Sequence, residues 1–212
     1  MSTATRVIAV ALLVLGSIAT PAWAQTGDVV QFFAGAALGL GLHESGHLLF
    51  DEAFGAEPGV RKVSAGFIPF FAITHEPVTP AKEFIISSAG FWAQHVGDEF
   101  LLSRRPNLRH EHAPFAKGLL AFNVLTSVMY AGTAFVQHGP VERDTLGIAV
   151  SADVAEPWIG ATILAPALLD GARYYRPQSS ALRWASRGAK VAGALLVLKA
   201  AGGRRQVAEG SS

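Results

Sequence analysis

The sequence predicts an all-α polytopic membrane protein with about four to six membrane helices and a short re-entrant or β-hairpin segment after the first core helix. Half of its 212 residues are hydrophobic and only 16% are charged, whereas about a quarter of the residues in a typical soluble domain are charged. The sequence also contains several long apolar runs. A net charge of +1 gives no indication of a nucleic-acid partner, so the lipid bilayer is the expected environment.

The N-terminal residues 1–24 are expected to form either an export signal peptide or a first membrane helix. Arg6 supplies the positive charge, residues 7–18 form an apolar core, and Ala22-Trp23-Ala24 fits a cleavage site. Both interpretations bring the chain to a membrane from the cytoplasm. We therefore expect an integral protein of a bacterial inner membrane, whose membrane domain occupies residues 25–201.

Within that domain, the apolar run 29–50 is long enough to cross about 30 Å of hydrocarbon. The same pattern predicts membrane helices over 115–136 and 157–172, and a last helix over 181–201. Three further segments have other expected structures: 63–74 is too short to span and is expected to be re-entrant or a β-hairpin, 139–156 reads as a polar loop, and 202–212 as a disordered tail.

The topology follows from the distribution of basic residues, which favour the cytoplasmic side. The 104–109 loop and the 173–190 linker are basic, and both are expected there. The relative direction of the 29–50 and 157–172 helices depends on the mixed segment 81–102. If that segment crosses the membrane, the two helices run antiparallel, and if it is re-entrant they run parallel.

The most informative motif is His43-Glu44-Ser45-Gly46-His47 at the end of an uncharged run. On a helix, side chains four residues apart share a face, so His43 and His47 can reach one Zn²⁺. Glu44 is the expected general acid/base, the catalytic residue of such a site. The chain has no cysteine, so any further ligand must be a histidine or a carboxylate.

Asp170 is the expected third ligand. It ends an uncharged apolar run, where a carboxylate is costly unless it binds a partner or a metal. The alternative is an interfacial aspartate that pairs with Arg173. His95 and Glu83 are weaker ligand candidates.

With these residues in place, the chain resembles the site-2 protease family of intramembrane zinc metalloproteases. Four segments carry the resemblance in chain order: the motif 43–47 on its apolar helix, the short apolar stretch 63–74, residues 83–91 with Ser88-Ala89-Gly90, and residues 166–173 with Leu169-Asp170-Gly171. The resemblance implies that His43, His47 and Asp170 bind zinc, that Glu44 is catalytic, and that membrane proteins or peptides are the substrates.

Two positions depart from the family pattern. Phe91 stands where proline is expected, and Thr162 stands where the family has an asparagine that positions the substrate backbone. Asn123, within the 115–136 run, could supply the missing amide as a substrate-binding residue, or it could form a helix–helix hydrogen bond. The expected function is that of a zinc-dependent intramembrane peptidase. The alternative is a zinc-binding membrane protein without proteolytic activity.

Overall fold

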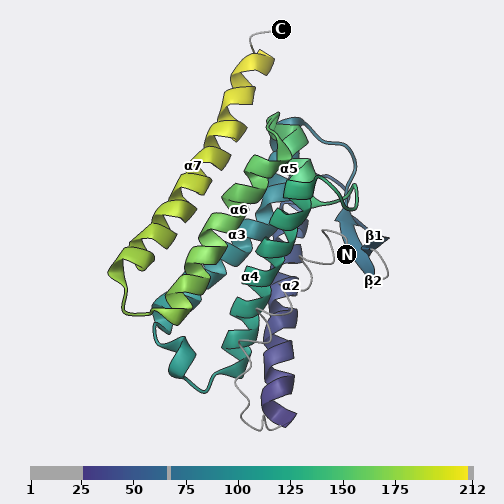
Figure 1. Ribbon diagram of the computed structural model, residues 1–212. Coiled ribbons are helices and arrows are strands. Elements are labelled where there is room, and N and C mark those ends of the chain that lie inside the picture. Colours follow the sequence, from purple (N-terminus) through teal and green to yellow (C-terminus); the bar gives the residue numbers. More distant parts are fainter. Residues whose placement is uncertain (1–25, 66–67, 210–212) are drawn as a thin grey trace.

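The computed structural model describes residues 26–65 and 68–209, which form a helical bundle with a two-stranded sheet beside it (Figure 1). The elements in chain order are α2 (Thr26–Phe54), β1 (Gly59–Ala65), β2 (Ile68–Thr74), α3 (Pro80–Arg104), the 3₁₀ turn η1 (Leu108–His110), α4 (Pro114–Val136), α5 (Asp144–Ala152), α6 (Glu156–Tyr175) and α7 (Ser180–Glu209). The predicted mainly helical fold is therefore confirmed.

Helices α2 and α4 run side by side in the same direction. Gly35 of α2 packs on the backbone of Phe115, and Gly118 of α4 packs on the backbone of Phe32. Because these glycines have no side chain, the two backbones approach closely. Helices α3 and α6 run the opposite way (Figure 1), so α2 and α6 are antiparallel. This is the arrangement expected if the segment 81–102 traverses the whole bundle.

The segment after α2 is a β-hairpin, as one of the two expectations for residues 63–74 required. Strands β1 and β2 pair antiparallel, with Gly59 opposite Thr74. The hairpin begins earlier than expected, because β1 starts at Gly59 and includes the basic residues Arg61 and Lys62.

The prediction of a loop over residues 139–156 is wrong in the centre of that segment, where the helix α5 forms from Asp144 to Ala152. Thr145, Ile148 and Ala149 recur at helical spacing and are buried, so one face of this short helix packs on the bundle. Helix α5 contacts mainly α3 and α6. This packing gives Asp144 a fixed place at the first turn of a helix.

The structure describes most of the C-terminal segment but not the N-terminal one. Helix α7 continues to Glu209, through most of the expected disordered tail, in a stretch whose arginine, glutamine, alanine and glutamate residues favour helix. The expected signal segment 1–24 and residues 210–212 lie outside the described residues.

Among the described residues, α4 is the helix that is long and apolar enough to cross a membrane, judged by length and composition. Only 28% of its most apolar 18-residue stretch is buried in the protein. The two basic segments meet at one end of the bundle, where Arg109 donates to the Tyr175 carbonyl and Gln178 donates to Asn107. This proximity agrees with the expectation that both segments share one side.

Candidate metal centre

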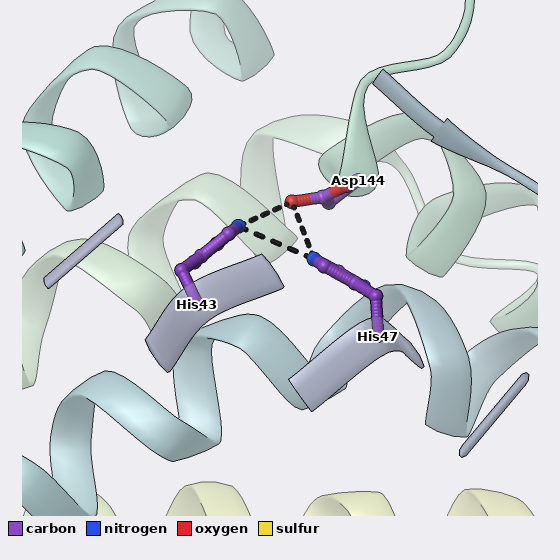
Figure 2. Close-up of side chains that lie close together, drawn as sticks. All are labelled: His43, His47 and Asp144. Carbon is purple, nitrogen blue, oxygen red and sulfur yellow. Dashed lines mark hydrogen bonds and ion pairs between the residues drawn. The ribbon is translucent and has the colours of Figure 1, made fainter. Parts of the chain in front are cut away.

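Three side chains converge beside α3: His43 and His47 of α2, and Asp144 at the start of α5 (Figure 2). His43 Nε2 lies 3.1 Å from Asp144 Oδ2, and His47 Nε2 lies 3.4 Å from the same oxygen. The two Nε2 atoms are 3.2 Å apart. The paired histidines thus face one point, as the motif spacing predicts, and a carboxylate from 101 positions along the chain joins them.

These separations fit a zinc ion. Donor atoms held about 2.0 Å from zinc at tetrahedral angles lie about 3.3 Å from one another, and the three observed distances bracket that value. Two nitrogens and one oxygen also form a donor set that zinc accepts in catalytic sites, with a fourth position left for water or substrate. The cluster could therefore hold a metal ion, and zinc suits its geometry.

Each histidine is held in orientation by its surroundings. His47 Nδ1 lies 2.8 Å from the Ile86 carbonyl oxygen, to which only an N–H can donate, so Nε2 is the ring nitrogen that could bind a metal. The His43 ring stacks on Tyr130 and meets Phe91 edge-on, with ring centroids 5.9 and 5.2 Å away. Both histidines are buried.

Helix α3 can approach the histidines because its facing residues are small. A β-carbon added at Gly90 would lie 2.6 Å from both His43 Cε1 and His47 Nε2. Gly46, inside the motif, packs in the same way on the backbone of Ala89. The Ser88-Ala89-Gly90 segment, which carries part of the family resemblance, therefore forms the surface of α3 against which the motif packs.

Asp144 is positioned by a clamp on its two neighbours. Arg143 donates through Nε and Nη2 to both carboxylate oxygens of Glu156, each at 2.7 Å. Thr145, on the other side of Asp144, donates to Glu156 Oε1, also at 2.7 Å. Because Glu156 begins α6, the clamp ties the first turn of α5 to α6 and leaves the Asp144 side chain directed at the histidines (Figure 2).

The charges at this end of the bundle favour an ionised ligand. Burial by itself would raise the pKa of the Asp144 carboxyl, but the charge and hydrogen bonds of His47 and His43 outweigh burial and hold that pKa well below its usual range. Burial also acts to raise the pKa of Glu156, and the hydrogen bonds from Arg143 and Thr145 outweigh it and lower that pKa. Both carboxylates are therefore anionic at neutral pH.

Glu44 lies where the motif predicts, next to the ligands. It is half-buried and close enough to His43, His47 and Asp144 for their charges to act on it.

The structure puts Asp144, and not Asp170, in the position expected for the third ligand. The Asp170 carboxylate accepts hydrogen bonds from Ser186 at 2.6 Å, Lys190 at 2.9 Å and Arg173 at 3.3 Å. The alternative interpretation of Asp170, an ion pair with Arg173, describes its position. The reason is the length of α6: Asp170 lies near the C-terminal end of that helix, whereas the metal centre is beside its N-terminus.

Asn123 is also away from the metal centre. Its side chain is buried, and Nδ2 donates to Asp98 Oδ1 at 2.7 Å. This is the helix–helix hydrogen bond that was the alternative to substrate binding. Of the weaker ligand candidates, Glu83 accepts from Ser87 and pairs with His75, while His95 packs on Trp92.

An apolar cavity of about 590 Å³ lies next to the centre, between α3, α5, α6 and α7. Phe91 lines this cavity and also contacts the His43 ring. Ile148, one turn after Asp144, lines it as well. The metal centre and the cavity therefore share a wall that is one side chain thick.

Comparison of the chain with protein-family models, with curated proteins and with solved structures finds no match.

Two residues of the centre were missed in the sequence, Asp144 and Tyr130. Asp144 follows Arg143 in a segment that looks like a solvated acidic loop. One signal was present: Asp144 precedes an uncharged stretch, 145–152, with helical spacing of apolar residues, as the first turn of a packed helix would. Tyr130 carries no sequence signal beyond its position in an apolar helix.

Proposed function

We propose that this chain is a zinc-dependent peptidase that acts in a membrane, with His43, His47 and Asp144 as the ligands and Glu44 as the general acid/base. The observation that carries the proposal is the convergence of these three donor atoms at tetrahedral zinc spacing. Glu44 follows the first ligand directly, as the acid/base does in peptidases with this motif.

In this proposal, the side chains of the protein carry out the proton transfers of peptide hydrolysis. Zinc, when bound, supplies Lewis acidity that brings the pKa of a water molecule toward about 7 and polarises a carbonyl. Glu44 then accepts a proton from the attacking water and donates it to the leaving amine nitrogen. Asp144 and the two histidines hold their donor atoms fixed, and Phe91 and Tyr130 hold the His43 ring in place by packing against it.

The membrane part of the proposal is supported by the outward-facing apolar side chains. Phe33 and Leu49 on α2 are 66% and 65% exposed, and α4 is apolar and mostly unburied. Faces of this kind are stable in contact with lipid chains. The apolar cavity beside the centre further favours a hydrophobic substrate segment, so we propose membrane-embedded peptides as the substrate class.

A second candidate is a zinc-binding membrane protein without proteolytic activity. It is favoured by the positions of Asp170 and Asn123, because two residues that the family resemblance assigned to the site contact other partners. Both candidates require zinc at the same three ligands. They differ only in what Glu44 does.

The deciding experiment compares Glu44→Gln with Glu52→Gln, a matched change at an exposed position on the same helix. The purified proteins are assayed for bound zinc by mass spectrometry and for cleavage of labelled apolar peptides in liposomes. Retained zinc with cleavage reduced at least about a hundredfold in Glu44→Gln alone supports the peptidase. Zinc binding without cleavage by the unaltered protein supports the second candidate, and absence of tightly bound zinc contradicts both.

A further inference from the structure

A second buried polar assembly lies near the opposite end of the bundle from Asp144, where α3, α6 and α7 meet (Figure 1). We call it the ion cluster; its members are Asp98, Glu99, Asp170, Arg173, Ser186, Arg187 and Lys190. Asp170 is fully buried. Glu99 accepts hydrogen bonds from Arg173, Arg187 and Lys190, and its side chain is 25% exposed. The ion cluster therefore extends from the protein surface into the interior.

Asp98 is the member of the ion cluster that contacts α4. It is 1% exposed and close enough to Asp170 and Lys190 for their charges to act on it. Its one hydrogen bond among the described residues comes from Asn123 of α4, at 2.7 Å. Asp98 thus connects the ion cluster to the interface between α3 and α4.

A row of polar residues continues from Asp98 toward the metal centre along that interface. Helices α3 and α4 are antiparallel, and two contacts define their register. Asp98 meets Asn123 at one end, and Phe91 meets Tyr130, with ring centroids 5.0 Å apart, at the other.

Between these two contacts, Gln94 lies on the face of α3 that carries Phe91 and Asp98. Ser127 lies on the face of α4 that carries Asn123 and Tyr130. The register places Gln94 and Ser127 at the same level.

The polar atoms in this row lack partners. Gln94 Nε2 and Oε1, Asn123 Oδ1 and Ser127 Oγ are buried, and none has a hydrogen-bond partner among the described residues. A buried polar atom left unsatisfied costs about 1–3 kcal/mol, so four such atoms would cost on the order of the whole stability of a domain. A bond between Gln94 and Ser127 would satisfy only part of the amide.

We propose that Gln94, Asn123 and Ser127 form a hydrated path that joins the ion cluster to the metal centre. Water is the ligand: it can donate to the amide and hydroxyl oxygens and accept from the amide N–H, and buried water typically makes about three such bonds. The path begins at the partly exposed Glu99 and Arg187, passes Asp98, and ends at Tyr130 against the His43 ring. Its use for hydrolysis rests on the proposed function, but its hydration does not.

The absence of cysteine from the chain permits a direct test. Single cysteines are introduced by Ser127→Cys, which replaces only oxygen by sulfur, and by Gln94→Cys. The purified proteins are treated with a small charged methanethiosulfonate reagent, and modification is followed by mass. The reactive species is the thiolate, which forms in contact with water and is suppressed in apolar surroundings.

Two control variants define the scale. Ala131→Cys lies one turn beyond Ser127 on α4 at an equally buried position, 1% exposed. His110→Cys lies in an exposed turn.

Modification of Ser127→Cys and Gln94→Cys at least about tenfold faster than Ala131→Cys is the expected result. Rates at both row positions as slow as at Ala131→Cys, while His110→Cys reacts, would overturn the hydrated path. The measurement requires neither bound zinc nor cleavage. It therefore succeeds or fails independently of the proposed function.

Discussion

Exchanging Asp144 and Asp170 for asparagine, one at a time, separates the proposed metal ligand from the structural carboxylate. Asp144→Asn removes the charged oxygen that lies 3.1 and 3.4 Å from the two histidine nitrogens. Structural zinc sites with four ligands bind with about 10–16 kcal/mol, so one ligand contributes roughly 3 kcal/mol. At about 1.4 kcal/mol per tenfold change, the zinc dissociation constant of Asp144→Asn should rise by about two orders of magnitude.

Asp170→Asn is the matched variant, because Asp170 is also an aspartate near a helix end but pairs with Lys190 and Arg173. Removing one partner from a buried ion pair costs about 3–5 kcal/mol of folding stability. We therefore expect a lower melting temperature and an unchanged zinc dissociation constant for the folded protein.

The assay is competition for zinc against a fluorescent chelator in detergent, combined with thermal unfolding of both variants. The assignment of Asp144 would be refuted by the reverse pattern, in which Asp170→Asn weakens zinc binding by two orders of magnitude and Asp144→Asn binds as tightly as the unaltered protein.

Two further predictions concern the packing around the centre, and a third concerns the membrane. Gly90→Ala adds a carbon 2.6 Å from both histidine rings and should weaken zinc binding at least about tenfold by chelator competition; Gly97→Ala, where the same helix faces open space, should not. Glu156→Gln breaks the clamp on Asp144 and should weaken zinc binding by about 10–100-fold, while Glu111→Gln, in an exposed ion pair, should have no effect. Because the pKa of Glu156 is lowered, the clamp persists at neutral pH and is lost only as the pH falls through that lowered value. Finally, the protein should stay in the membrane fraction after a carbonate wash; its release into the supernatant would contradict the membrane proposal.

Much of the fold could be predicted from local patterns. The apolar runs 29–50, 115–136 and 157–172 are helical because their length and composition suit no other element in this chain. The short run 63–74 belongs to a hairpin, as its length indicated. The prediction for residues 139–156 was wrong. Its polar residues indicate a loop, and the helix α5 within it has only nine residues and one buried face.

The sequence by itself determined the half of the metal centre that is local. His43, Glu44 and His47 lie close together because of helical spacing alone, and this does not depend on tertiary contacts. Only the tertiary structure decided the third candidate ligand. Along the chain only Asp170 ends an uncharged apolar run, whereas Asp144 lies in a polar segment with Glu142 two residues before it. The clamp on Glu156 brings Asp144 to the histidines, whereas Lys190, Arg173 and Ser186 satisfy Asp170 in the ion cluster, and such pairings depend on helix packing across the whole bundle.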